Sequence, residues 1–363
     1  MLIYFLLLLI WLVLSVLFSG KGGNVDCNPK SKWRFCLWAS IPMILIMGLR
    51  GAQVGSDTPA YLDRFENSLY ILTEDSMQDE VGYNYLNVLI SNILGWNFNA
   101  LLLITSFFIC IVFARFVYHF SPDSLFSYFL HLTIGMFYMS MSGIRQCMAV
   151  SFCLLGLILV YKTDKKFKRV FAVLLVAIGY TFHNSAFFFL PFVLLPEFRL
   201  SKQKIIIALF LSAFLFIFND VIANFFIQFT PSRYQSYGLD ASYKANYLVY
   251  FIPLAIIIFC IISIKPDKQG KYNSDISMMF VFLLLNFFFM AFMPLNNQIG
   301  RISFYFINSF VILIPYAIRD IPLRDRGGVK IATCIVCLVY FILGVYGGTL
   351  AIDDYYFYWQ NPK

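Results

Sequence analysis

Residues 98–118 read FNALLLITSFFICIVFARFVY, a run of 21 residues with a single charged side chain, Arg115. Such a run is long enough to cross a hydrocarbon layer of about 30 Å as an α-helix. Similar runs follow one another along the chain, which is 60% hydrophobic, 19% aromatic and 13% charged. Lipid offers no partners to free backbone groups, and the runs are far longer than barrel strands. They therefore predict an all-α integral membrane protein.

About twelve spans are expected, and residues 1–363 are treated as one transmembrane domain. The first run is taken as a retained helix rather than a signal peptide, because no positive residue precedes it. A shorter segment, residues 83–96, carries three asparagines and ends at Trp96, so it is expected to be an interfacial helix. The expected spans are residues 1–18, 33–49, 98–118, 124–142, 144–161, 168–182, 184–197, 205–220, 247–264, 276–295, 302–318 and 330–348.

The charged residues support this order of spans. With these boundaries, one face of the membrane receives 20 of the 27 Lys and Arg residues and 8 acidic residues, while the other receives 7 basic and 11 acidic residues. The positive-inside rule makes the basic face cytoplasmic, and an even number of spans then places both termini on the outer face. Topology thus explains the basic balance of the chain, and no nucleic-acid partner is expected.

Three basic residues of the outer face, Arg50, Arg145 and Arg301, stand at the mouths of apolar spans. A guanidinium keeps its charge and presents a planar fork that matches phosphate oxygens, so three of them suit a diphosphate. Ion pairs with the acidic outer loop are the structural alternative, and for Arg145 contact with lipid headgroups is another.

The longest outer loop, residues 50–82, is too long for a simple connector and is expected to fold back over the outer end of the helices as a cap. It carries Asp57 and Glu80, and His183 lies at a junction of two spans on the same face. Each of the three can take a proton, which transfer of a sugar to a hydroxyl group requires. Glu80 and His183 both remain candidates for the base, and a structural role of His183 is equally open.

Five motifs on the predicted outer face resemble the EpsG-type Wzy polymerases of bacterial surface polysaccharides. The resemblance runs from about Tyr4 to the C-terminal tail, with one mild departure, Gly55-Ser56-Asp57 in place of the Gly-Thr-Asp of the family. The motifs are Arg50 with Val54-Gly55-Ser56-Asp57-Thr58 and Tyr61, Glu80-x-Gly82-Tyr83, Ile144-Arg145-Gln146 with Ala149, Phe182-His183-Asn184-Ser185, and Arg301-Ile302-Ser303-Phe304-Tyr305-Phe306.

The resemblance implies an inner-membrane polymerase of the Wzy-dependent pathway, related to the GT-C class of multispanning glycosyltransferases. Such an enzyme acts on the periplasmic side, and both termini would be periplasmic. Donor and acceptor are oligosaccharide repeat units linked to undecaprenyl diphosphate, and the product is an O-antigen, capsule or exopolysaccharide. No cofactor is expected, and a chain-length regulator is a potential partner beside membrane lipid.

Roles follow for the outer-face residues. Arg50, Arg145 and Arg301 would hold the leaving diphosphate, with Gln146 and Arg64 as further substrate-binding residues. Asp57, Glu80 and His183 would be the catalytic group, and Tyr61 and Tyr83 would stack on sugar rings. No metal is expected, because the arginines already neutralise the diphosphate and acid pairs on solvated tails usually bind nothing. That tail, from Asp353-Asp354 to Trp359, is expected to lie among lipid headgroups.

Three other classes of membrane protein remain possible. A flippase for lipid-linked oligosaccharides would also contact a diphosphate, but its basic residues should line a lumen from both faces. An O-antigen ligase would use the same donor with another acceptor. A membrane O-acyltransferase would make His183 the central base and would not require Arg145 or Arg301.

Overall fold

The protein is helical throughout the part of the chain that the computed structural model describes, which is residues 2–19, 24–73, 80–218, 221, 225, 248–292, 297–347 and 351–360. These residues form helices and two isolated β-bridges, with no strand among them. The all-α prediction is confirmed for this part. The count of twelve spans, the relation to the GT-C class and the topology remain predictions.

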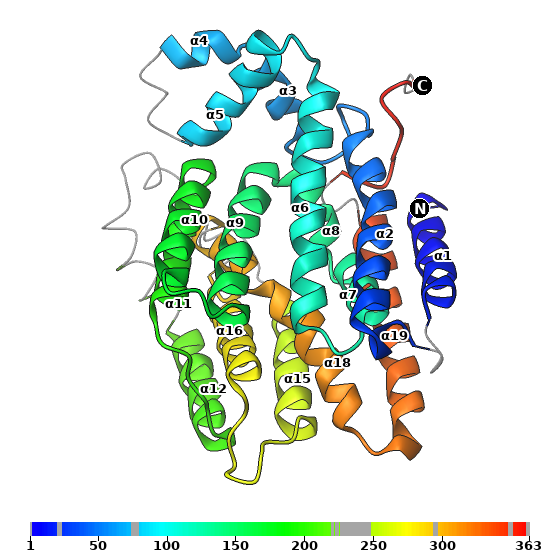
Figure 1. Cartoon of the computed structure of the whole chain (residues 1–363), viewed down its shortest axis with the longest axis vertical. Helices are drawn as coiled ribbons and strands as arrows, with labels where there is room; N and C mark the ends of the chain where they lie inside the picture. Colours follow the sequence, from blue (N-terminus) through cyan, green and yellow to red (C-terminus); the bar gives the residue numbers. More distant parts are fainter. Residues whose placement is uncertain are drawn as a thin grey trace. The chain divides into compact units, whose positions relative to one another are not determined.

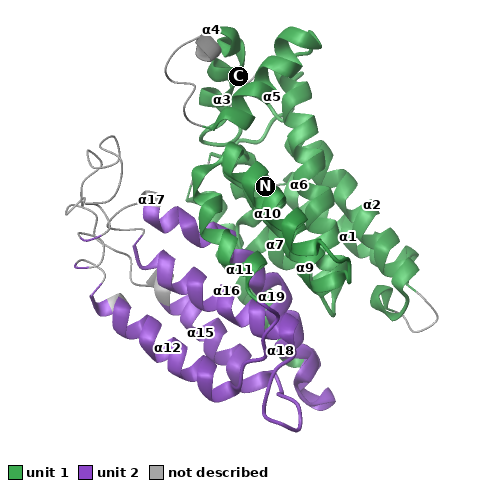
Figure 2. Ribbon diagram, turned by 60° about the vertical axis from the view of Figure 1, so that its left-hand side comes forward, with its two compact units in different colours: residues 1–195, 328–363 green, residues 196–327 purple. Residues whose placement is uncertain are grey.

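The chain divides into two compact units, residues 1–195 with 328–363 and residues 196–327 (Figure 2). The sequence predicts a single domain, and this remains a prediction although the contacts divide the chain into two units. Unit 1 contains α1 (Leu2–Leu17), η1 (Val25–Cys27), α2 (Pro29–Gly48), α3 (Thr58–Glu66), α4 (Ser68–Thr73), α5 (Val81–Val88), η3 (Leu89–Ile93), α6 (Phe98–Phe120), α7 (Ser124–Thr133), α8 (Met136–Ser142), α9 (Ile144–Lys162), α10 (Lys168–Phe182), η4 (Asn184–Phe189), α11 (Leu190–Leu194) and, from Gly328 onward, α19 (Leu323–Tyr346).

Unit 2 is helical as well. The helices that the structure describes there correspond to four expected spans, residues 205–220, 247–264, 276–295 and 302–318. They are α12 (Lys202–Ile217), α15 (Leu248–Ser263), α16 (Ser274–Met290), α17 (Asn297–Gly300), η5 (Arg301–Tyr305), η6 (Ile307–Ser309) and α18 (Phe310–Asp320).

Unit 1 is built around a row of four helices in the order α2, α6, α9 and α10 (Figure 1). The short helices α3, α4 and α5 lie across one end of this row. By length and composition, three helices among the described residues can cross a membrane: α6, α9 and α19. Shorter apolar helices are Leu2–Leu17, Asn184–Leu194, Phe251–Ser263 and Ser274–Met290. Several long apolar helices are typical of a membrane protein.

Polar side chains set where several helices begin. The Asn97 carboxamide accepts a hydrogen bond from Ala100 N at 3.1 Å and starts α6, and Asn273 does the same for Ile276 N at 2.8 Å in α16. Such caps satisfy backbone donors that have no partner inside the helix. Gly135, with φ +94°, interrupts the run expected as one span, residues 124–142, and divides it into α7 and α8. The expectation of one continuous helix there is wrong.

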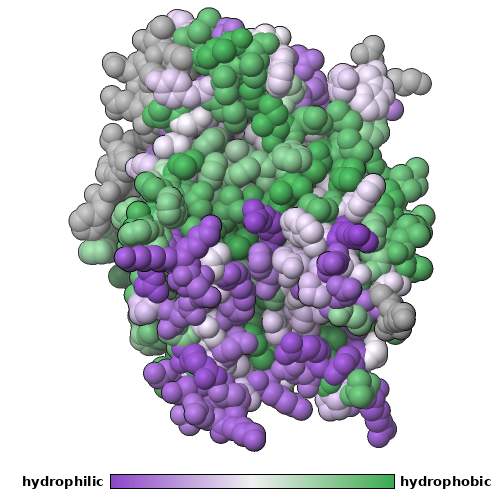
Figure 3. All heavy atoms as spheres, viewed as in Figure 1, coloured by the Kyte–Doolittle hydropathy of each residue, from purple (hydrophilic) through white to green (hydrophobic). Residues whose placement is uncertain are grey.

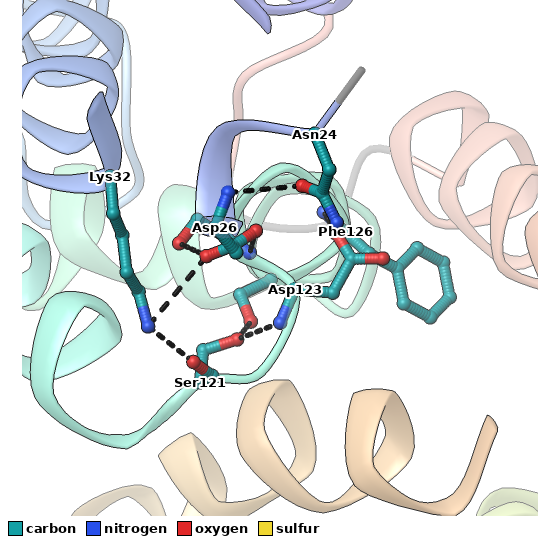
Figure 4. Close-up of polar contacts among 8 residues, drawn as sticks. Asn24, Asp26, Lys32, Ser121, Asp123 and Phe126 are labelled. Atoms are coloured by element: carbon teal, nitrogen blue, oxygen red, sulfur yellow. Dashed lines mark hydrogen bonds and ion pairs between the residues drawn. The ribbon is translucent and has the colours of Figure 1, made fainter. Parts of the chain in front are cut away.

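A group of charged residues, here called the capping cluster, joins the start of α2 to the start of α7 (Figure 4), and an ion pair with Lys330 adds α19. Asp26 accepts hydrogen bonds from the Ser124 hydroxyl at 2.6 Å and its backbone N–H at 2.9 Å, and it lies 3.6 Å from Lys32 Nζ. Asp123 caps Phe126 N at 3.0 Å and pairs with Lys330 Nζ at 2.5 Å. The capping cluster is Asp26, Lys32, Asp123 and Lys330.

Apolar side chains remain exposed on several helices of unit 1. In α1, Leu2, Leu9 and Val16 are 84%, 55% and 73% exposed, and hydrophobic atoms cover this helix in Figure 3. In α19, Leu343 and Tyr346 are 68% and 74% exposed. A water-soluble monomer rarely exposes apolar surface of this extent, whereas contact with lipid tails explains it.

Candidate active site

Glu80, Arg145 and His183 meet at the end of unit 1 where α3 and α5 lie. Glu80 directly precedes α5, Arg145 is in the first turn of α9, and His183 follows the last residue of α10. Arg145 Nη1 donates a hydrogen bond to Glu80 Oε2 within an ion pair, and His183 Nδ1 lies 3.8 Å from Glu80 Oε1. The structure thus brings together the two candidates for the base and one of the three predicted diphosphate ligands. With Arg64, these residues are called the acid–arginine cluster.

The backbone of Glu80 is held in a conformation that disfavours a side chain. Its φ and ψ angles are 58° and 45°, in the left-handed region, and its side chain caps no helix donor. This conformation costs an L-residue about 1–2 kcal/mol compared with the right-handed one. Strain of this kind persists where the surrounding structure imposes it, and it is enriched at functional sites.

Glu80 is brought to His183 by close packing of α5 against α10. A Cβ atom at Gly82 would overlap the Thr181 hydroxyl oxygen, so only glycine permits this approach. His183 itself has extended backbone and ends α10 through a hydrogen bond from its N–H to Gly179 O at 3.0 Å. The Ser185 hydroxyl lies 3.3 Å from His183 Nδ1 and helps to orient the ring. The motif Glu80-x-Gly82 thus combines an acid with the residue that positions it.

Two buried tyrosines support Arg145. Its guanidinium carbon lies 5.4 Å from the centre of the Tyr61 ring, and the Tyr61 and Tyr83 rings are in edge contact at 5.6 Å. A guanidinium over an aromatic face is stabilised by the ring quadrupole. Tyr61 and Tyr83 are 3% and 0% exposed, so they would stack on sugar rings, as predicted, only if α3 moved away. In this structure they hold Arg145 in place.

A second arginine, Arg64, also faces Glu80. Its Nε donates a hydrogen bond to Asn84 Oδ1 at 2.9 Å, and Asn84 is 2% exposed. Burial lowers the pKa of Arg64, as does the neighbouring positive charge of Arg145, while Glu80 acts in the opposite direction. Glu80 thus pairs with Arg145 and lies within the electrostatic influence of Arg64. Within the cluster two guanidinium groups stand against one carboxylate, an arrangement that suits an anion.

The surroundings of Glu80 shift its pKa. Burial raises the pKa of Glu80 above its ordinary value of 4.5, against the opposing influence of Arg145 and Arg64. The side chain is 11% exposed, compared with 29% for Arg145 and 22% for His183. A carboxyl group with a raised pKa accepts a proton more readily near neutral pH, which is the property that a general base requires.

The loop before α3 carries Asp57, the third predicted catalytic residue. Asp57 is half-buried, precedes α3 and accepts a hydrogen bond from the Ser56 hydroxyl at 3.3 Å. The loop is attached to the end of α8, because Ser56 N donates to Ser142 Oγ at 3.0 Å. Gln146, predicted to bind substrate, follows Arg145 in α9 and is 2% exposed.

Arg50 occupies a different environment from Arg145. It is 1% exposed, and its guanidinium donates to the backbone carbonyl oxygens of Val54 at 3.1 Å, Met141 at 2.7 Å and Met47. A diphosphate could reach it only by displacing these carbonyls. The arrangement instead joins the end of α2, the start of the outer loop and the end of α8, three residues before Ile144. These hydrogen bonds give Arg50 a structural role, because they connect three segments of unit 1.

Arg301 belongs to unit 2, where it is half-buried and begins η5. The backbone after it is fixed by Asn286, whose side-chain amide donates to Ser303 O at 3.0 Å. Its role toward a diphosphate stays a prediction from the sequence. Among the residues that the structure describes, no group of three His, Cys, Asp or Glu side chains is placed to hold a metal ion.

Sequence reasoning left part of the cluster unassigned. Asn84, which orients Arg64, was not a candidate, because a buried asparagine on a short helix has no distinctive sequence signal. The support that Tyr61 gives to Arg145 was also missed. For Gly82 a signal did exist, since a glycine directly after a loop acid indicates a position where two backbones approach closely.

Long apolar helices with a charged, partly buried cluster at one end define a helical membrane protein with a polar site near its surface. A comparison with protein-family models adds the family. The model of the EpsG family matches residues 33–358, nearly the whole chain, and the protein belongs to this family. The resemblance of the five motifs is thereby confirmed. Family membership supports a role in polysaccharide biosynthesis. Neither the curated proteins nor the solved structures contain a match.

Proposed function

We propose that the protein is a glycosyltransferase that polymerises oligosaccharide repeat units carried on undecaprenyl diphosphate, acting at the periplasmic face of a bacterial inner membrane. The observation that carries the proposal is the acid–arginine cluster, where Glu80, Arg145, His183 and Arg64 meet from four segments of the chain. Membership in the EpsG family supports the same class of reaction.

The reaction would transfer a growing chain to the next unit. A hydroxyl oxygen of the acceptor bonds to the anomeric carbon of the donor sugar, while the bond from that carbon to the diphosphate oxygen breaks. The electron pair leaves with the lipid diphosphate, and the hydroxyl proton passes to the base. Negative charge grows on the leaving diphosphate in the transition state, where preorganised guanidinium groups are most effective.

In this proposal Arg145 and Arg64 bind the diphosphate and Glu80 is the base. Glu80 is paired with Arg145 in the structure, so the diphosphate and Glu80 compete for the same guanidinium. Binding of the donor would release the carboxylate from Arg145 and leave it beside His183. The base would thus become available only when a donor is present, which limits proton transfer in the empty site. His183 remains the second candidate for the base.

The depth of the cluster agrees with the substrate. The diphosphate of a lipid carrier stays at headgroup level because its hydrocarbon tail lies in the bilayer. Arg145 is in the first turn of α9, a helix long and apolar enough to span the membrane. The loop of residues 50–82, with α3 and α4, would then cover the site as a cap.

The proposal predicts a change in glycan length when Arg145 is removed. A strain of the native host that lacks the gene is complemented with wild type or Arg145→Ala at equal protein level, and the surface glycan is resolved by length. We expect wild type to restore the ladder and Arg145→Ala to give single repeat units, because the leaving diphosphate is no longer held. The matched control is Arg115→Ala, because Arg115 is an exposed arginine near the C-terminal end of α6. This variant should restore the ladder.

Other outcomes would assign another function. A full ladder from Arg145→Ala would contradict the role of that residue. In the strain that lacks the gene, complete absence of surface glycan would indicate a flippase, and a glycan of normal length with altered mass would indicate an acyltransferase. Completed chains that stay attached to the lipid carrier would indicate a ligase.

A further inference from the structure

The C-terminal tail is fixed to the outer loop by backbone hydrogen bonds. An antiparallel bridge joins Arg50 and Phe357, with Gly51 N donating to Tyr356 O at 2.9 Å and Tyr358 N to Leu49 O at 3.0 Å. Further along, Gly55 N donates to Ala351 O at 2.8 Å. A Cβ at Gly51 would overlap the Tyr356 ring, so the close approach depends on glycine. The tail is therefore an ordered part of unit 1.

This attachment presents two aromatic rings. Phe357 and Trp359 are stacked with centres 4.6 Å apart and an angle of 4° between their planes, and Tyr358 is in edge contact with Trp359 at 5.0 Å. Trp359 is 58% exposed. A turn closed by Gln360, whose side chain accepts from Phe357 N at 2.8 Å, fixes the pair. The result is an aromatic stack, here called the platform, in which Phe357 lies against one face of the Trp359 ring.

Polar groups accompany the platform. Asp353, Asp354 and Gln360 of the tail are exposed, and so is Gln53 of the loop beneath it, whose N–H donates to the Tyr356 hydroxyl at 3.2 Å. A flat aromatic face with exposed acceptors on the same tail suits a neutral glycan, whose sugar rings have an apolar C–H face and a rim of hydroxyl donors. An anionic lipid surface suits it poorly, because the two carboxylates would be repelled.

The platform is connected to the acid–arginine cluster through residues of unit 1. The tail contacts residues 49–55, Ser56 N donates to Ser142 Oγ, and Ile144 begins the helix that carries Arg145. In Figure 1 the tail lies at the end of unit 1 where α3 and α5 lie. The tail and the cluster thus belong to the same end of unit 1, where sugar residues remote from the reacting bond would lie.

We propose that the tail is a glycan-binding subsite, in which one neutral sugar residue of the polymer stacks on Trp359 and hydroxyls of the polymer donate to Asp353 and Asp354. The identity of the occupant rests on the proposed function, whereas the platform does not. Holding the polymer beside the cluster would keep it near the next acceptor. The subsite would thus favour long products without taking part in bond formation.

The test uses the purified full-length protein in nanodiscs of zwitterionic lipid. The probe is an oligosaccharide of two or three repeat units, released from the polysaccharide of the native host and free of lipid, with binding followed by ligand-observed NMR. We expect Trp359→Ala to weaken binding about fivefold, the loss of one aromatic contact. Trp96→Ala, an exposed tryptophan at the end of the interfacial segment, is the matched control and should bind as wild type. Asp353→Asn with Asp354→Asn should weaken binding as well.

Unchanged binding by Trp359→Ala would overturn the proposal. The polymerase assay separates this proposal from the proposed function. We expect Trp359→Ala to make the first transfer at the wild-type rate but to give shorter chains. Absence of polymerisation by the wild type would instead refute the polymerase, while oligosaccharide binding at Trp359 would stand.

Discussion

α9 has a charged cluster near each end: Arg145 of the acid–arginine cluster is in its first turn, and Lys162 at its last residue influences Lys32 of the capping cluster. The acids of the two clusters serve different purposes. In the capping cluster, Asp26 and Asp123 both accept hydrogen bonds from backbone N–H groups, so their positions are explained by the fold. In the acid–arginine cluster, Glu80 caps no helix and has strained backbone. Burial raises the pKa of Glu80 and of Asp26 alike. The direction of the pKa shift therefore does not distinguish the two clusters. The hydrogen bonds that each acid accepts do distinguish them.

The comparison teaches how to separate structural from functional charge in this membrane protein. An acid that completes the backbone hydrogen bonding of a helix end stabilises the fold, typically by about 1 kcal/mol. An acid on strained backbone next to two arginines, with a pKa that burial raises, contributes little of this kind. The second pattern is the one expected where stability is exchanged for activity.

The largest expected effect on stability comes from adding a side chain at Gly82. Gly82→Ala forces α5 away from Thr181 and Glu80 away from His183, while the capping cluster is untouched. We expect a loss of about 2 kcal/mol in the free energy of unfolding, by overpacking, and roughly tenfold lower polymerase turnover. Denaturation in detergent and a turnover assay measure the two effects.

Thr181→Ala provides the control for this change. Added to Gly82→Ala it removes the hydroxyl in the way of the new methyl group, so the double variant should recover part of both losses. Equal losses in the single and double variants would show that packing at this contact does not position Glu80.

Backbone strain at Glu80 predicts an unusual order of stability. Neither Glu80→Ala nor Glu80→Gly has a carboxylate, so the difference between them isolates the left-handed backbone. We expect the glycine variant to be more stable by about 1 kcal/mol, measured by denaturation in detergent, because glycine adopts this conformation without steric cost.

The matching change in the capping cluster is Asp123→Ala. It should cost about 1 kcal/mol through loss of the cap on Phe126 N and leave turnover unchanged. A Glu80→Gly variant no more stable than Glu80→Ala would remove the argument from strain. Loss of turnover in Asp123→Ala would remove the contrast between the ends of α9.

The smallest effect is expected in the pH profile of turnover. If ionised Glu80 is the base, activity falls as pH decreases through its pKa, which lies above 4.5. Arg64 lowers this pKa, so Arg64→Gln should move the acid limb of kcat/KM to higher pH. A limb that stays in place or moves to lower pH would mean that the titrating group is not Glu80.

Much of the helical arrangement was predictable from the sequence, because each apolar run ends at polar or basic residues. The runs expected at residues 98–118 and 168–182 form α6 (Phe98–Phe120) and α10 (Lys168–Phe182). The break at Gly135 was missed, since a glycine inside an apolar run is common in membrane helices. The separation into two units was also not predictable, because it depends on contacts between distant segments.

The site was predictable in its members but not in their arrangement. Glu80, Arg145 and His183 were candidates because charged or titratable residues at the ends of apolar spans need a reason to be there. The structural role of Arg50 could not be predicted, because its acceptors are carbonyl oxygens, which every residue has. Whether an arginine meets phosphate or backbone depends on the tertiary fold. Pairs such as Arg64 and Asn84 likewise form only when helices pack.

The most direct test is the turnover of Glu80→Gln in a purified assay with a synthetic repeat unit on undecaprenyl diphosphate. Glutamine keeps the shape of the side chain and removes its capacity to take the proton. We expect turnover to fall about a hundredfold or more while the protein remains folded, and His183→Ala, assayed in parallel, to lose less. Near-normal turnover of Glu80→Gln would contradict the account, because the acid–arginine cluster would then lack its base.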